Sequence, residues 1–267
     1  PMRVAGTSAL AAKHLAKKGA RSVALIGTGW QAQAQLRAID TVHEISDFRV
    51  YSTQKENRDQ FAMEWSEKIG AQIRPCETAQ EAVAGAGHVQ ESAPENPTVK
   101  IPVLEAIAAA CPADTVIASS TSGIKPSDLQ PSIDNPGRFV VGHPYNPVYL
   151  LPLVEVVGGK MTDAAALHRA MATYTEISMK PVHVRVEIDA FIGERLLEAV
   201  WREALWLVND GVATTEEIDD VIRYGFGLRW AQMGLFETYR IAGGEGGMAH
   251  FIRQFGPCLQ WPWTKLV

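Results

Sequence analysis

Near its N-terminus the chain carries the run Val23-Ala24-Leu25-Ile26-Gly27-Thr28-Gly29-Trp30-Gln31-Ala32. The four apolar residues predict a short buried strand, and the polar and Ala-rich residues that follow predict a helix. A glycine-containing turn between strand and helix brings backbone N–H groups close to a pyrophosphate, and a small residue at Ala32 lets the helix pack tightly. The run therefore predicts a dinucleotide-binding βα unit, with an ordinary tight turn as the alternative. The expected cofactor contacts are Gly27, Thr28, Gly29, Trp30 and Gln31.

The second predicted strand, Phe48–Tyr51, ends in Ser52-Thr53-Gln54-Lys55, without an acidic residue. An NAD site normally carries Asp or Glu there to bind the ribose hydroxyls. Hydroxyl groups and a cation suit the 2′-phosphate of NADP better, although a solvated loop that accepts either cofactor is the alternative. We therefore expect NAD or NADP, favour NADP, and add Ser52 and Thr53 to the cofactor contacts.

Short apolar runs alternate with helical stretches over the first 186 residues. Apolar runs at 115–118, 139–141 and 153–157 read as strands, and 57–69 and 101–110 read as helices. Such alternation is typical of βαβ units on a mostly parallel sheet. We therefore predict an α/β protein whose residues 1–186 form a Rossmann-type, doubly wound domain.

Residues 187–267 read as a smaller, all-helical domain. A long helix is predicted over Ile188–Val208 and ends before Gly211, and the next begins at Thr214, with Glu217 placed to complete a capping box. The apolar helix faces exceed what the core of one chain needs, and large apolar faces usually mark subunit interfaces. We expect a substrate-binding and dimerisation domain, and a homodimer.

The composition excludes several classes of function. The 267 residues are 46% hydrophobic and 21% charged, and 25 Lys and Arg against 30 Asp and Glu give a net charge of −5. This balance does not indicate a basic surface that would bind nucleic acid or an anionic membrane. No apolar run is long enough to span a bilayer, and no secretory leader is recognised. Three scattered cysteines lack metal-ligand spacing, so we expect reduced thiols, no metal and a cytoplasmic location.

Polar residues gather where predicted strands end. The segments Ser119–Gly123 and Gly142–Pro147 each follow an apolar strand, and ligands of open α/β sheets bind beyond the carboxyl ends of strands. Glu155 lies inside an apolar strand, where a carboxylate is costly to bury unless a cation or donor meets it. A partner His143 would form a general-base dyad. The alternatives are a histidine that only fills space and an edge-strand Glu155 that faces water.

Several segments resemble the L-3-hydroxyacyl-CoA dehydrogenase superfamily, and within it the enzymes that act on L-carnitine. They are Gln90–Glu95, Ile117–Gly123, Val140–Gly159, Val208–Thr215, Ile222–Trp230 and Gly243–Met248. The resemblance covers about residues 88–267 and implies a catalytic pair, His143 and Glu155, with Ser122 at the substrate. The residues that it implies beside the nicotinamide are Glu95, Lys100 and Asn146.

The first 87 residues resemble a different family. The segments Arg3–Ala16 and Ile26–Gln33 are similar to the nucleotide-binding unit of the ornithine cyclodeaminase/mu-crystallin family. The two resemblances together predict a chimeric chain, in which the opening βαβ unit of one Rossmann family precedes the rest of another.

These observations predict an NAD(P)-dependent dehydrogenase of a small 3-hydroxy acid, with L-carnitine oxidised to 3-dehydrocarnitine. One alternative is a 3-hydroxyacyl-CoA such as 3-hydroxybutyryl-CoA. Against it, the helical half lacks a Lys/Arg cluster for CoA phosphates, and Glu194 stands where the resemblance expects Asn. The other alternative is a non-catalytic, crystallin-like nucleotide-binding protein.

A trimethylammonium group donates no hydrogen bond, so proteins usually surround it with aromatic faces. Tyr145 lies two residues after His143, and Trp201 and Trp230 lie in the helical half. We expect these three rings to contact the substrate; the alternative for each tryptophan is a purely packing role.

Overall fold

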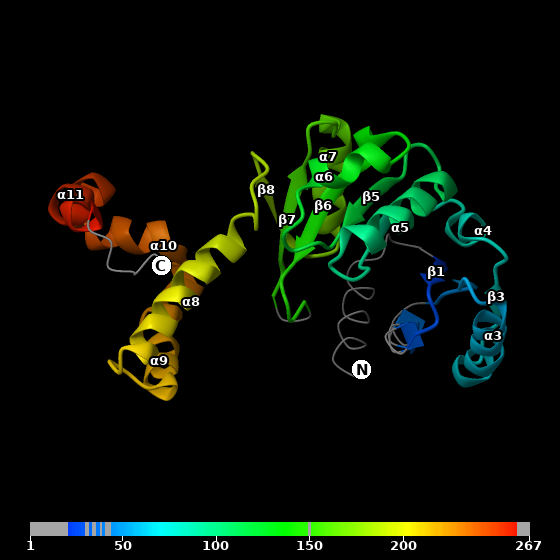
Figure 1. Ribbon diagram of the computed structural model, residues 1–267, viewed down its shortest axis with the longest axis horizontal. Coiled ribbons are helices and arrows are strands. Elements are labelled where there is room, and N and C mark those ends of the chain that lie inside the picture. Colours follow the sequence, from blue (N-terminus) through cyan, green and yellow to red (C-terminus); the bar gives the residue numbers. More distant parts are fainter. Residues whose placement is uncertain are drawn as a thin grey trace. The chain divides into compact units, whose positions relative to one another are not determined.

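The computed structural model describes residues 21–29, 32–33, 36–37, 39–40, 44–148 and 151–260. The chain divides into two compact units, Pro1–Ile192, which carries the sheets, and Gly193–Val267, which is helical (Figure 1). The sequence suggested a boundary after residue 186, whereas the structure divides the chain after Ile192. The reason is that Glu187 accepts hydrogen bonds from Ser127 and Phe191 is fully buried, both within the first unit.

The first unit opens with a three-stranded parallel sheet in the order β1-β2-β3. Its strands are Ser22–Ile26, Asp47–Tyr51 and Ile73–Pro75. Parallel strands need a crossover connection, and α3 (Lys55–Ile69) supplies it between β2 and β3. Phe48 on β2 and Trp65 on α3 belong to one buried cluster, so the helix covers the sheet.

A second sheet of five strands has the order β4-β5-β6-β7-β8. Its strands are His88–Glu91, Val116–Ser119, Phe139–Pro144, Leu153–Gly158 and Lys180–Val184. All neighbouring pairs are parallel except β6 and β7, which run antiparallel. The predicted Rossmann-type, mostly parallel sheet is thereby confirmed.

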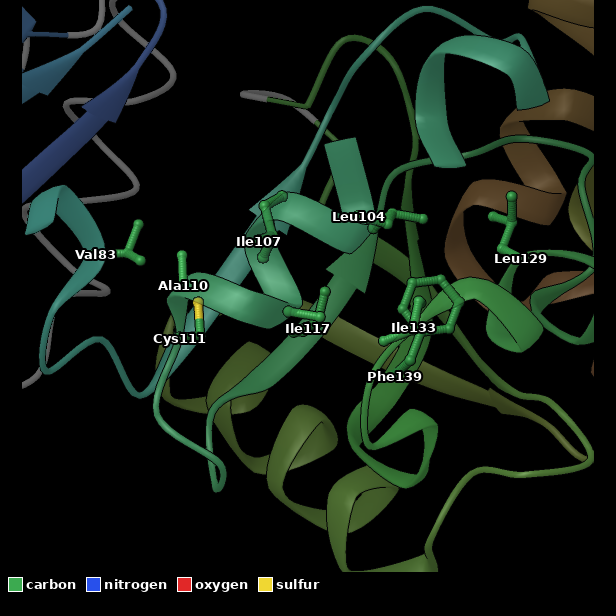
Figure 2. Packing of buried hydrophobic residues seen from close by; sticks show 10 residues of the cluster. Val83, Leu104, Ile107, Ala110, Cys111, Ile117, Leu129, Ile133 and Phe139 are labelled. Carbon is green, nitrogen blue, oxygen red and sulfur yellow. The ribbon is translucent and has the colours of Figure 1, made fainter. Parts of the chain in front are cut away.

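Helices cover both faces of the five-stranded sheet. They are α4 (Ala79–Val83), α5 (Pro97–Ala110) and α6 (Pro126–Leu129), two 3-10 turns at Gln130–Ser132 and Pro136–Arg138, and α7 (Ala164–Glu176). Side chains alternate along a strand. Ile117 of β5 therefore joins the cluster of Leu104 and Ile107 from α5 (Figure 2), whereas Val116 joins the cluster that contains Tyr174 of α7. This doubly wound arrangement leaves the carboxyl ends of the strands open for a site.

The second unit is helical, as the sequence predicts. Its helices are α8 (Gly193–Asn209), α9 (Thr215–Val221), a π-helical turn (Ile222–Phe226), α10 (Gly227–Ala242), α11 (Gly247–Phe255) and 3-10 turns at Gly244–Gly246 and Gly256–Gln260. The capping box of Thr214 and Glu217 is present, and Gly211 adopts a left-handed φ of 69° after α8. Both local signals are therefore confirmed.

The start of α8 corrects one prediction. The helix was expected from Ile188 but begins at Gly193. Ala190 and Phe191 have φ values of 61° and 49°, in the left-handed region, which a right-handed helix cannot contain. The segment 187–192 is thus a turn of the first unit and leads into α8.

Within the described ranges, no helix is both long enough and apolar enough to cross a membrane.

Gly142 on β6 lies against the hydroxyl group of Tyr174. A Cβ atom at Gly142 would overlap that hydroxyl, which is buried and donates a hydrogen bond of 2.6 Å to Gln90 Oε1. Because the ring is packed under the sheet, it cannot withdraw without losing these contacts. Glycine is therefore required here for close approach, although its φ is not left-handed.

We expect Gly142→Ala to lower the apparent free energy of unfolding by about 1–3 kcal/mol through overpacking. Gly87→Ala is the matched control, because a Cβ atom there meets no atom within 4 Å. Urea unfolding followed by circular dichroism measures both variants. Equal stability of the two would show that Tyr174 yields freely.

Candidate active site

His143 and Glu155 form a buried pair at the carboxyl end of β6. In the antiparallel β6–β7 ladder they are directly opposite partners, so their side chains stand on the same face. His143 Nδ1 lies 3.1 Å from Glu155 Oε2, and the two residues are only 5% and 1% exposed. His143 and Glu155 therefore have the predicted paired geometry. His143 does more than fill space, and Glu155 does not face water at a sheet edge.

Two further donors contact Glu155. The hydroxyl of Tyr145 lies 3.2 Å from Oε2, and the backbone N–H of Ile192 donates to Oε1 at 2.9 Å. Hydrogen bonds to a buried carboxylate stabilise its charged form. With Nδ1–H directed to this carboxylate, the imidazole of His143 has Nε2 as its basic nitrogen.

Aromatic rings flank the imidazole of His143. The ring centroid of Tyr145 lies 5.0 Å from that of His143, and the centroid of Phe191 lies 5.9 Å away. Phe191 is fully buried on the turn that precedes α8. The histidine is therefore held by neighbours from the loop after β6, from β7 and from the segment 187–192.

The loop after β5 carries Ser122, which is exposed. Its neighbour Thr121 is fully buried and donates through its hydroxyl to Glu95 Oε1, and the backbone N–H of Gly123 also points to this oxygen, at 3.3 Å. The loop after β4, which carries Glu95, is thus bonded to the loop that carries Ser122. Both loops lie at the carboxyl edge of the sheet.

Lys100 lies below this edge and is not on its surface. Its ammonium, 1% exposed, donates to both oxygens of Glu91 at 3.1 and 3.3 Å and to the carbonyl of Ala93 at 2.8 Å. Ser119 donates to Glu91 at 2.5 Å, and Glu95 lies 3.8 Å from the ammonium. A direct contact of Lys100 with the nicotinamide, as the resemblance implied, would require it to leave a satisfied buried ion pair.

Gln90 near the end of β4 joins two neighbouring strands, and no role for it was predicted from the sequence. Its Nε2 donates to Ser120 Oγ at 2.7 Å and to the carbonyl of Gly142 at 3.1 Å, and its Oε1 accepts from Tyr174. Burial raises the pKa of the Tyr174 hydroxyl, so this hydroxyl remains a donor at every working pH. The polar pair Gln90-Glu91 at a strand end was the available signal; Tyr174, inside a helix, carried none.

The glycine turn after β1 lines a cavity of about 810 Å³. Gly27 has a φ of 103°, and its N–H donates to the carbonyl of Tyr51 at 2.8 Å, which fixes the turn against β2. Beside both Gly27 and Gly29 a Cβ atom would meet no atom within 4 Å, so the backbone faces open space. Gln90 and Ser92 also line the cavity. These residues fit a dinucleotide; Thr28 lies in the same turn, and Trp30 and Gln31 lie outside the described residues.

Ser52 and Thr53 directly follow β2, at the carboxyl end of that strand. Lys55 opens α3 and pairs with Asp59 at 2.5 Å on the surface. The described part of this loop contains no carboxylate between β2 and α3.

The remaining predicted contacts lie at the site or in the other unit. Asn146 is exposed in the turn before Pro147, three residues after His143. Trp201 is exposed on α8, and Trp230 on α10 packs against Phe226 at a ring distance of 4.6 Å. In the described residues no three His, Cys, Asp or Glu side chains gather in a way that could hold a metal ion.

Two family models match the chain almost end to end. The model of the 3-hydroxyacyl-CoA dehydrogenase NAD binding domain matches residues 6–188, and that of the C-terminal domain matches residues 191–263. The first model runs through residue 87 without a break. The second family expected for residues 1–87, and with it the chimera, therefore finds no support.

Relatives named for carnitine oxidation are close in sequence. The L-carnitine dehydrogenase of Mesorhizobium japonicum is 51% identical over 255 residues, which cover 91% of this chain and 69% of that protein. That of a Pseudomonas species is 48% identical over 262 residues, 95% and 81% of the two chains. The L-carnitine dehydrogenase/betainyl-CoA thioesterase of Rhizobium meliloti is 60% identical over 190 residues, 71% of this chain and 38% of its own length.

Solved structures agree on the fold. An NAD⁺-dependent dismutase, 5-formyl-3-hydroxy-2-methylpyridine 4-carboxylic acid 5-dehydrogenase, matches with a TM-score of 0.71 and 26% identity over 92% of this chain and 83% of its own. A 3-hydroxyacyl-CoA dehydrogenase from Archaeoglobus fulgidus matches with a TM-score of 0.65 and 22% identity, over 89% and 82% of the two chains. With its NAD binding and C-terminal domains both matched, the chain belongs to the 3-hydroxyacyl-CoA dehydrogenase family.

Proposed function

We propose that the chain is an NAD(P)-dependent dehydrogenase that oxidises the 3-hydroxyl group of L-carnitine to give 3-dehydrocarnitine. The observation that carries the proposal is the buried His143–Glu155 pair at the strand end, in a unit that also carries a glycine turn that fits a dinucleotide. Its family acts on CH–OH groups. Relatives that match this chain over more than two thirds of their own length are named L-carnitine dehydrogenase. An intact dyad favours an enzyme over a nucleotide-binding protein without catalysis.

In this mechanism His143 Nε2 takes the proton of the substrate hydroxyl. A nicotinamide cofactor held at the Gly27–Gly29 turn would accept the hydride from C3, as the C–O bond becomes a carbonyl. Glu155 holds the imidazole through Nδ1 and stabilises the imidazolium that forms. A general base of this kind contributes about 10²–10⁴ in rate.

Residues on the neighbouring loops orient the reactants. Ser122 and Asn146 are exposed and polar at the carboxyl edge, where they suit the reacting oxygen and the carboxamide of the cofactor. Glu95 is held by Thr121 and Gly123 and would face the nicotinamide side. We assign Lys100 an indirect role: through Glu91 and the Ala93 carbonyl, it fixes the loop that carries Glu95.

A homodimer remains part of the proposal. α8 presents Leu196, Leu197, Trp201 and Leu205 at 50–57% exposure, and none of its residues is buried in the chain. A contiguous apolar face of this kind is typical of a subunit interface.

Removal of the dyad tests the proposed function. We expect His143→Ala to lower kcat for L-carnitine oxidation by at least about 10²-fold, because the substitution removes the proposed general base. NAD affinity should stay close to that of the unmodified protein, because His143 is not among the residues that line the cavity beside the glycine turn. Glu155→Gln should also lower kcat, by leaving the imidazolium uncompensated.

The measurement is NADH formation at 340 nm, with NAD binding by fluorescence as the control. 3-Hydroxybutyryl-CoA, assayed in parallel, tests the second candidate substrate. A wild-type kcat in His143→Ala would remove the general-base assignment, and turnover of the thioester alone would replace carnitine.

Cofactor choice follows from Ser52 and Thr53. The described loop between β2 and α3 contains no carboxylate that could accept hydrogen bonds from the ribose hydroxyls. We therefore expect NADP to bind at least as well as NAD. Ser52→Asp should supply a carboxylate that binds the ribose hydroxyls, and should shift the binding preference toward NAD by about tenfold, or about 1.4 kcal/mol. Fluorescence titration with both cofactors measures this, and a tenfold preference of the unmodified protein for NAD would refute the expectation.

Trimethylammonium recognition makes a separate prediction. Loss of an aromatic face worth about 0.5–2 kcal/mol raises KM for L-carnitine by about 2- to 30-fold. We expect this for Trp230→Ala and not for Trp230→Phe, which keeps an aromatic face. KM for 3-hydroxybutyrate, which lacks the cation, should change much less in both. Equal losses on the two substrates would mean that Trp230 only packs.

A further inference from the structure

Tyr145 shares one carboxylate oxygen with His143. Its hydroxyl donates to Glu155 Oε2 at 3.2 Å, and His143 Nδ1 lies 3.1 Å from the same atom. The other oxygen, Oε1, accepts the N–H of Ile192 at 2.9 Å. The carboxylate is 1% exposed and therefore cannot turn toward water to relieve this competition.

A donor on a carboxylate lowers the attraction that the carboxylate exerts on a nearby cation. The Tyr145 hydroxyl stabilises negative charge on Oε2, the same charge that stabilises a protonated His143. The hydroxyl thus opposes protonation of the imidazole, while Glu155 favours it.

We propose that Tyr145 is a positioning residue whose hydroxyl, acting through Glu155, keeps His143 in the unprotonated form that can accept a proton. The proposal rests on the proposed role of His143 as general base. It is separate from any contact between the Tyr145 ring and substrate, because the ring and the hydroxyl can be removed independently.

The printed contacts of the His143 imidazole come from three elements of the first unit. Glu155 from β7 and Tyr145 from the loop after β6 are titratable groups that contact it. Phe191, from the turn before α8, faces it with a neutral ring.

The direction of the effect follows from these contacts. In Tyr145→Phe, Glu155 loses one donor and attracts the imidazolium more strongly, so the pair keeps its proton to higher pH. The competent, neutral imidazole then appears only at higher pH. The hydroxyl acts on His143 only through the charge of Glu155, so the expected shift is a modest one, about 0.5–1 pH unit.

The first experiment is the pH profile of kcat/KM for L-carnitine. Tyr145→Phe should move the acidic limb upward by about 0.5–1 pH unit, so that its loss of activity is several-fold larger at low pH than on the plateau. Tyr224→Phe, at an exposed tyrosine of the helical unit, is the matched control and should leave the limb in place. An unmoved or lowered limb in Tyr145→Phe would overturn the proposal.

A second readout does not depend on turnover. In protein labelled with ¹³C-histidine, the His143 signal is identified by its loss in His143→Ala and titrated without substrate. Its midpoint should be higher in Tyr145→Phe than in the unmodified protein, and identical midpoints would overturn the inference. If the midpoint rises but L-carnitine is not oxidised, the proposed substrate fails and the role of Tyr145 stands.

Discussion

The rest of the site depends on the hydrogen bonds that the carboxylate of Glu155 accepts. The carboxylate is buried, and it is contacted by His143 on the opposite strand, by Tyr145 on the following loop, and by Ile192 on the turn before α8. The antiparallel register of β6 and β7 sets His143 and Glu155 face to face. A slip of one residue would turn Glu155 to the other side of the sheet and leave His143 without its partner.

The loops around this pair are aligned by hydrogen bonds more than by apolar packing. Gln90 connects the ends of β5 and β6, and Glu95 connects the loops after β4 and β5. Below them the buried pair of Glu91 and Lys100 satisfies its own charges and fixes the start of the loop. Buried polar networks of this kind are stable only when fully paired, and they then specify one arrangement of the groups that they join.

Much of the fold and of the candidate site could be predicted from the sequence. The glycine turn at Gly27 and Gly29, the alternation of strands and helices and the His143–Glu155 pair all rest on local patterns with a direct physical meaning. The left-handed turn at Ala190 and Phe191 could not be predicted, because neither is a glycine and the apolar pattern around them suits a helix. Lys100 and Gln90 depend on partners brought in by the fold, so their roles required coordinates.

In the proposed reaction, C3 of L-carnitine gives its hydrogen to the cofactor while His143 removes the hydroxyl proton. L-Carnitine deuterated at C3 tests this step most directly, with NAD as acceptor and mass spectrometry of the reduced cofactor as the readout. We predict one deuterium in each NADH formed and a slower rate than with the unlabelled substrate if hydride transfer limits turnover. NADH without deuterium, or no NADH from L-carnitine at all, would contradict it.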